Sequence, residues 1–135
     1  MISSKLSSLL KTVKTIAIVG VSSNVQRDSY KVMKFLIDYG YEVFPVNPNE
    51  SNKKILNQKC YSSLNDIKQK IDMVDVFRSS EYVFDIAKEA VFINADILWT
   101  QEGVIDDRAA DFAKKEGLIV IMDECPKKIL EESFK

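Results

Sequence analysis

TIAIVG, at residues 15–20, is a run of small and β-branched residues closed by a glycine. A short run of this kind without polar alternation predicts a strand that is covered on both faces. Downstream, apolar residues recur at helical spacing, at Val32, Phe35, Leu36 and Tyr39. Gly40 follows at a position where glycine commonly ends a helix. The segment therefore predicts a strand, a loop and a helix in succession.

The same alternation continues along the chain. Apolar runs predict further strands at 42–46, 73–77, 96–99 and 118–122, and helical spacing predicts helices over 83–91 and 105–113. We also expect a polar loop at 49–57, a minimal strand at 59–61 and a short helix at 63–68. Strands that are buried on both faces and separated by helices indicate an α/β fold. We expect the Rossmann-like, doubly wound class, with a mostly parallel sheet, helices on both faces and a single domain.

Residues 1–14 differ in character, because they carry lysines and serines but no acidic residue. Their apolar side chains recur at helical spacing, at Ile2, Leu6, Leu9, Leu10 and Val13. This predicts an amphipathic helix packed on the domain that residues 15–135 form. Leu9 and Leu10 are too short an apolar core for a signal peptide. A transit peptide stays open as the alternative, although such peptides usually carry arginine and this segment has none.

Composition excludes several classes of function. The 135 residues contain 19 Lys plus Arg, 20 Asp plus Glu and no histidine, which gives a net charge of −1. The lack of histidine excludes histidine-activated nucleophiles and histidine metal sites, and the charge balance argues against a nucleic-acid binder. No apolar run approaches about 18 residues, so we expect no membrane span. Cys60 and Cys125 have no metal-site spacing and form no disulfide scaffold, which indicates a cytoplasmic protein.

In an open parallel sheet, ligands bind beyond the carboxyl ends of the strands. The first of these ends carries Gly20, Val21, Ser22 and Ser23, followed by Arg27, Ser29 and Lys31 near the start of the next helix. Hydroxyl and cationic groups beside a helix N-terminus suit a phosphate, although the further glycines of G-x-G-x-x-G are missing. The alternative is a tight-turn glycine, with Ser29 as the helix cap and Arg27 as a solvated charge.

The other strand ends narrow the class of ligand. Val46-Asn47-Pro48 stands where a classical NAD site has Asp or Glu, which disfavours NAD and leaves an adenine nucleotide in another pose. Phe77 and Arg78 end the next strand, and the arginine suits either a phosphate or a surface ion pair. Trp99 is expected in the core, and Gln101-Glu102-Gly103 forms a turn. Cys125 is either a small buried thiol or a contact for a ligand thiol.

Together these strand ends resemble one family, the small stand-alone CoA-binding proteins related to the N-terminal domain of the succinyl-CoA synthetase α subunit. The resemblance runs from about residue 15 to residue 128. It rests on IVGVS at 18–22, the spacing of Arg27 and Ser29, VFPVNP at 43–48, VDVFR at 74–78, LWxQxG at 98–103 and MDxCP at 122–126. Each motif is weak alone, whereas their order and spacing are specific.

The resemblance implies a fold that binds coenzyme A or a short acyl-CoA by its ADP end, with the pantetheine along the strand ends. It implies that Gly20 and Ser22 lie in the diphosphate loop, with Arg27 and Ser29 at its far end. It further implies that Val46-Asn47-Pro48 lies beside the adenosine and that Gln101-Glu102-Gly103 lies toward the thiol. The candidate binding residues are Gly20, Val21, Ser22, Ser23, Arg27, Ser29, Lys31, Val46, Asn47, Pro48, Phe77, Arg78, Gln101 and Gly103, with Cys125 as the contact for the ligand thiol.

This chain lacks the histidine-bearing second domain of the synthetase, so we expect binding without catalysis of its own. Two alternatives stay open, a subunit of a multi-chain acyl-CoA ligase or transferase and an NAD(P)-binding redox sensor. The expected partner is the small-molecule ligand, with no nucleic acid and no membrane. The sequence leaves a homo-oligomer open.

Overall fold

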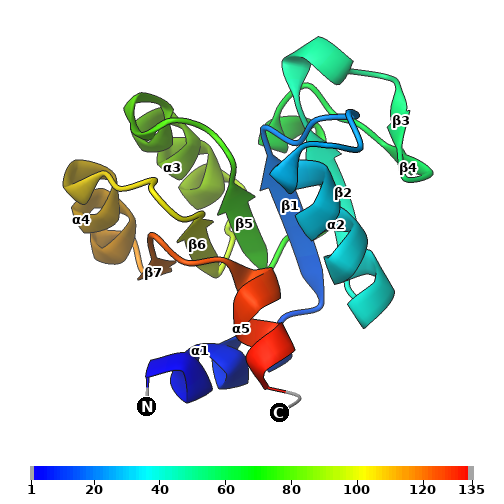
Figure 1. The fold of residues 1–135 in the computed structure, drawn as a ribbon. Helices are drawn as coiled ribbons and strands as arrows, with labels where there is room; N and C mark the ends of the chain where they lie inside the picture. Colours follow the sequence, from blue (N-terminus) through cyan, green and yellow to red (C-terminus); the bar gives the residue numbers. More distant parts are fainter. Residues whose placement is uncertain (1, 134–135) are drawn as a thin grey trace.

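A computed structural model describes residues 2–133 of the chain. Its centre is a parallel sheet of five strands, β1 (Thr15–Val19), β2 (Glu42–Val46), β5 (Met73–Val76), β6 (Ile97–Thr100) and β7 (Ile119–Ile121). Their order is β2-β1-β5-β6-β7 (Figure 1). The predicted α/β fold is confirmed, and each of these strands begins and ends no more than one residue from its predicted bounds.

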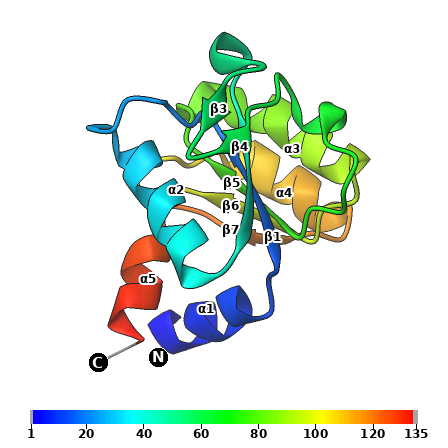
Figure 2. The same ribbon diagram turned by 90° about the vertical axis from the view of Figure 1, so that its right-hand side faces the viewer.

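Helices cover both faces of the sheet, as predicted (Figure 2). One buried cluster contains side chains of α1 (Ile2–Lys11), α2 (Asp28–Tyr39) and α5 (Pro126–Glu132), and the other contains those of α3 (Val83–Phe92) and α4 (Asp107–Lys115). Along β1, Ile16 and Ile18 belong to the first cluster, whereas Ala17 and Val19 belong to the second. Because both faces are covered, the strand has no polar side, which explains its unbroken apolar sequence.

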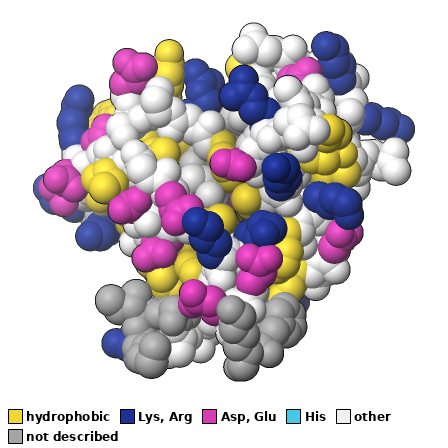
Figure 3. All heavy atoms as spheres, viewed as in Figure 1, with side chains coloured by type: hydrophobic (Ala, Val, Ile, Leu, Met, Phe, Trp, Pro, Cys, Tyr) yellow, Lys and Arg dark blue, Asp and Glu magenta, His cyan; other side chains and the backbone are white. Residues whose placement is uncertain are grey.

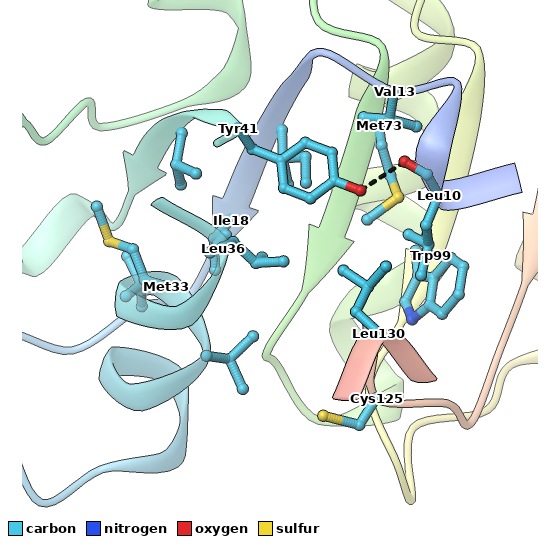
Figure 4. Packing of buried hydrophobic residues seen from close by; sticks show 14 of the residues in the cluster. Leu10, Val13, Ile18, Met33, Leu36, Tyr41, Met73, Trp99, Cys125 and Leu130 are labelled. Carbon is cyan, nitrogen blue, oxygen red and sulfur yellow. Dashed lines mark hydrogen bonds between the residues drawn. The ribbon is translucent and has the colours of Figure 1, made fainter. Parts of the chain in front are cut away.

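The N-terminal helix contributes to the first of these clusters. Leu10 of α1 is buried together with Leu130 of α5 and Trp99 of β6 (Figure 4). The hydroxyl of Tyr41 donates a 2.5 Å hydrogen bond to the carbonyl oxygen of Leu10, and burial raises the pKa of Tyr41 to about 12. Trp99 is fully buried, as predicted. Met1 and residues 134–135, which the predicted segments include, lie outside the described residues, as does the side chain of Ile2.

Several local predictions were wrong in detail. The segment 49–57 is not a plain loop, since it contains part of a 3-10 turn, η1 (Pro48–Glu50), and the first strand of the hairpin β3 (Lys54–Ile55) and β4 (Gln58–Lys59). Ile55 anchors this hairpin in the core, a tertiary contact that local polarity hides. Of the strand expected at 59–61, Lys59 belongs to β4 and Tyr61 forms one bridge with Val46. The helix expected at 63–68 is a 3-10 turn, η2 (Leu64–Asp66).

The strand order fixes where a ligand can enter. β1 lies between β2 and β5, and the chain therefore leaves β1 toward one side of the sheet and later returns on the other side. Sheets of this order bind their ligands at the point where the connections diverge, beyond the carboxyl ends of the central strands. Here that point lies between the ends of β1 and β5.

Candidate functional site

Gly20 brings the ends of β1 and β5 into close contact. Its φ is +91°, and a Cβ at this position would lie 2.4 Å from the carbonyl oxygen of Phe77 and 2.8 Å from Cδ of Arg78. Its backbone N–H donates to the carbonyl oxygen of Val46 at 2.8 Å, which also ties it to the end of β2. Only glycine fits here without strain, since it lacks the Cβ and tolerates positive φ.

Three cavities adjoin this point. The loop cavity, of about 470 Å³, is lined by Gly20, Ser22, Gln26, Arg27, Asp28, Ser29 and Phe77. The central cavity, of about 550 Å³, is lined by Asp28, Lys31, Val32, Phe77, Arg78, Ser79, Gln101, Glu102, Val104, Cys125, Lys127 and Lys128. The side cavity, of about 180 Å³, includes Val46, Pro48, Ser62 and Arg78 in its lining. Phe77 and Arg78 link these cavities, because Phe77 lines the first two and Arg78 the last two.

The loop between β1 and α2 uses many of its backbone donors internally. The N–H of Ser22 donates to Oγ of Ser29 at 3.0 Å, and the N–H of Asn24 donates to Oγ of Ser22 at 3.0 Å. Arg27 is the N-cap residue of α2, and its side chain does not cap the helix. The amides of the first helical turn therefore face the loop cavity without a capping side chain, as suits an anion. Ser29, the helix cap in the alternative interpretation, instead lies inside the first turn, where its Oγ stabilises the loop.

The segment that follows β2 supports the loop between β1 and α2. Nδ2 of Asn47 donates to the carbonyl oxygen of Val21 at 2.8 Å, and its Oδ1 accepts from the N–H of Asn49 at 3.0 Å. One turn later, Oε2 of Glu50 accepts from the N–H of Ser23 at 2.7 Å. Hydrogen bonds from the side chain and the backbone N–H of Ser23 lower the pKa of Glu50. Val46 and Pro48 line the side cavity, whereas both ends of the Asn47 amide are already used.

Arg78 stands between the central and side cavities. Its guanidinium carbon lies 4.1 Å from the centre of the Tyr82 ring, on the 3-10 turn η3 (Ser80–Tyr82). An arginine that stacks on an aromatic ring keeps its N–H donors at the ring's edge available. Of the two roles that the sequence left open, this position favours a contact with a ligand anion, because none of the ion pairs in the described chain involves Arg78.

The far wall of the central cavity comes from the ends of β6 and β7. Gln101 and Cys125 line it, and both are more than nine-tenths buried. Lys128 of α5 pairs with Glu102 at 2.9 Å across the mouth. Gly103 lies outside the cavity lining, and its N–H donates to Oδ1 of Asp123 at 2.6 Å.

Four predicted site residues, Val21, Ser23, Asn47 and Gly103, do not line the three cavities, and their described contacts stabilise the surrounding loops. The other predicted residues do line them. Lys127 and Lys128 were missed because α5 was not predicted, although Pro126 followed by Ile129 and Leu130 is a usable helix signal.

A buried carboxyl group was also missed. Asp75, in the middle of the apolar β5, is fully buried, and its two carboxyl oxygens lie 2.9 and 3.0 Å from one end of the Gln101 amide. Burial raises the pKa of Asp75 well above its usual value. The signal was present in the sequence, since an acidic residue inside an otherwise apolar strand rarely lacks a role.

The surface shows no dominant charge on the face that Figure 1 presents. Basic and acidic side chains are interspersed there (Figure 3).

In the part of the chain that the structure describes, no helix is both long and apolar enough to cross a bilayer. Within the same residues, no cluster of three Cys, Asp or Glu side chains is placed to hold a metal ion.

Comparisons with known proteins agree with this geometry. A sequence model of the CoA binding domain family matches residues 14–131. The protein YneT of Bacillus subtilis is 40% identical over 119 residues, which cover 88% of this chain and 87% of YneT. A solved structure described as a hypothetical protein from Pyrococcus horikoshii superposes with a TM-score of 0.91 at 33% identity, over 98% of this chain and 92% of that one.

A more distant relative is an enzyme. The ADP-forming acetate–CoA ligase of Methanocaldococcus jannaschii is 26% identical over 120 residues, covering 83% of this chain. This chain spans only 17% of the length of that ligase. The resemblance to CoA-binding domains that the strand ends predicted is thus confirmed at the level of the family.

Proposed function

The chain belongs to the CoA-binding domain family, which is related to acyl-CoA ligases, and on that premise we propose that it binds coenzyme A or a short acyl-CoA at the carboxyl edge of its sheet. The ADP end of the ligand lies over the loop and side cavities, and the pantetheine extends into the central cavity. The chain performs no reaction by itself.

The observation that carries this proposal is the set of three neighbouring cavities at the divergence of β1 and β5, which share Phe77 and Arg78 in their linings. CoA is a long ligand with a charged, aromatic end and a flexible amide-bearing arm. A single round pocket would not suit it, whereas a chain of cavities along a sheet edge does. Gly20 has no side chain, so the ends of β1 and β5 can lie close together beneath the ligand.

The loop cavity has groups that can bind the phosphates of the ligand. The first turn of α2 offers backbone N–H groups without a side-chain cap, and Arg27 stands beside them at the loop cavity. A helix N-terminus and a guanidinium together favour a diphosphate through the helix dipole and charge-assisted hydrogen bonds. Arg78 supplies a second guanidinium between the central and side cavities.

The thiol end of the ligand has a mixed environment. Val32 and Val104 offer apolar contacts in the central cavity, and Gln101 offers an amide. Cys125 lines the same cavity, which supports its proposed place near the ligand thiol. Cys125 and Cys60 are both free in the structure.

Thermal unfolding with added ligand tests the proposal. A ligand that binds only the folded chain adds about 2.7 kcal/mol to its stability at 100 times the Kd. We expect CoA and acetyl-CoA to raise the Tm in a concentration-dependent manner, with NAD giving little effect because no acidic residue follows β2 at the classical ribose position. An unchanged Tm at millimolar CoA would contradict the proposal.

Replacing Arg27 with alanine should weaken CoA binding by about 1.5–3 kcal/mol, because a charge-assisted contact to a phosphate is lost. Binding of pantetheine, which has no phosphate, should be unaffected. Arg108→Ala is the matched control, since Arg108 stacks on Phe84 and lines none of the three cavities. Equal losses for CoA and pantetheine would place Arg27 outside the phosphate site.

A second candidate function is that of one component of a multi-chain acyl-CoA ligase. The match to a short part of a much longer ligase favours it, since the other domains of such an enzyme can reside on separate chains. Affinity purification from the source cell, followed by mass spectrometry, should then recover an ATP-binding partner chain in stoichiometric amount. Recovery of the chain by itself would reject this candidate and leave simple binding.

A further inference from the structure

The central cavity has a fully buried carboxyl group beneath it. Asp75 stands in register with Ile18 of β1 and Trp99 of β6, so its side chain points to the sheet face that α2 and α5 cover. None of the ion pairs in the described residues involves Asp75. A buried carboxylate without a cation costs several kcal/mol, so the group is stable there only as the neutral acid.

A neutral carboxyl group needs an acceptor for its proton. Both oxygens of Asp75 lie within 3.0 Å of a single atom of Gln101, at one end of the side-chain amide. An ionised Asp75 would require the amide nitrogen at that end, whereas a protonated Asp75 requires the amide oxygen. Because the acid is neutral and a buried hydroxyl without an acceptor is costly, the amide oxygen of Gln101 faces Asp75.

The other end of the Gln101 amide is then its nitrogen, which carries two N–H donors. Gln101 is only 7% exposed and lines the central cavity. In this orientation the nitrogen faces only donors in the described chain, so its N–H groups have no protein acceptor there. A buried polar group that lines a cavity and has spare donors is suited to meet a ligand acceptor.

We propose that Asp75 is a positioning residue, which fixes the Gln101 amide so that its nitrogen donates to a carbonyl oxygen of the ligand arm in the central cavity. The inference rests on the proposed function, in which that arm is the pantetheine or its acyl group. Both carry carbonyl oxygens, in amides and in a thioester. Asp75 touches no ligand and acts only through Gln101.

Calorimetric titration of five variants with CoA and with ADP tests this role. Gln101→Ala and the isosteric Gln101→Glu should each weaken CoA about three- to tenfold, because the donor is lost, and should leave ADP unchanged. Asp75→Leu should weaken CoA to a similar extent and should add nothing in a Gln101→Ala background. Asp75→Asn can still donate to the amide oxygen and should bind CoA within about twofold of the unchanged chain.

The outcomes separate this role from its premise. If Gln101→Glu binds CoA as well as the unchanged chain, the amide presents its oxygen and the proposal is overturned. If Asp75→Leu does not fold, the CoA affinity of Gln101→Glu is sufficient to test the orientation of the amide. If all variants bind CoA equally, Asp75 positions nothing, although the proposed function stands. If the unchanged chain binds neither CoA nor ADP, the proposed function fails and the role of Asp75 fails with it.

Discussion

Replacing Gly20 with alanine should lower the free energy of unfolding by about 2–5 kcal/mol and abolish CoA binding. Positive φ alone costs a residue with a Cβ about 1–2 kcal/mol. At Gly20 the new Cβ also meets the backbone oxygen of Phe77 at 2.4 Å, so the ends of β1 and β5 must separate, at a further cost of about 1–3 kcal/mol. Since Phe77 and Arg78 each line two of the cavities, their displacement should destroy the site.

Gly117→Ala is a closely matched control for this experiment. Gly117 has a φ of +95°, close to that of Gly20, and a Cβ there would meet no atom within 4 Å. Urea denaturation should show only the conformational cost for Gly117→Ala, with CoA binding retained. If the two variants lose equal stability and both bind CoA, the close approach of β1 and β5 is not what Gly20 provides.

Replacing Asp75 with asparagine should stabilise the chain increasingly as the pH rises above about 4. The unfolded chain releases the Asp75 proton near the ordinary pKa of about 3.9. The folded chain retains this proton to higher pH, because burial raises the pKa of Asp75. Unfolding therefore becomes easier by about 1.4 kcal/mol for each pH unit until the folded-state pKa is reached, and the loss is constant above it.

Asparagine has no such proton, so the stability difference between Asp75→Asn and the unchanged chain should grow with that slope. Urea titrations of both proteins between pH 4 and pH 8 measure it. Asp111→Asn, at an exposed position of α4, controls for the loss of one negative charge. A stability difference that does not change over this pH range would show that Asp75 is ionised in the folded chain.

The sequence predicts the sheet well because its central strands are buried on both faces. The run from Thr15 to Val19 is apolar throughout, and an unbroken run of this kind has few alternative structures. The segment 49–57 was misjudged for the opposite reason. Its polar residues form a hairpin that packs on the core through Ile55 and the partly buried Leu56, and so few tertiary contacts leave no periodic signal.

The site was predictable in position more than in detail. Parallel strands bring their carboxyl ends to one edge, so Gly20, Phe77 and Gln101 could be grouped from the chain alone. The hydrogen bonds that each side chain makes could not be predicted from the sequence, since Asn47 and Ser29 are equally able to contact a ligand or a neighbouring loop. In the structure both contact the loop. The pairing of Asp75 with Gln101 joins two strands across the sheet and has no counterpart in local spacing.

Isothermal titration of the unchanged chain with CoA tests the central claim most directly. We expect saturable binding of one CoA per chain, with ADP competing for the same site and pantetheine binding more weakly than CoA, because the phosphates supply the charge-assisted contacts. Heats no greater than those of dilution at millimolar CoA, or CoA binding that saturating ADP does not reduce, would contradict the account.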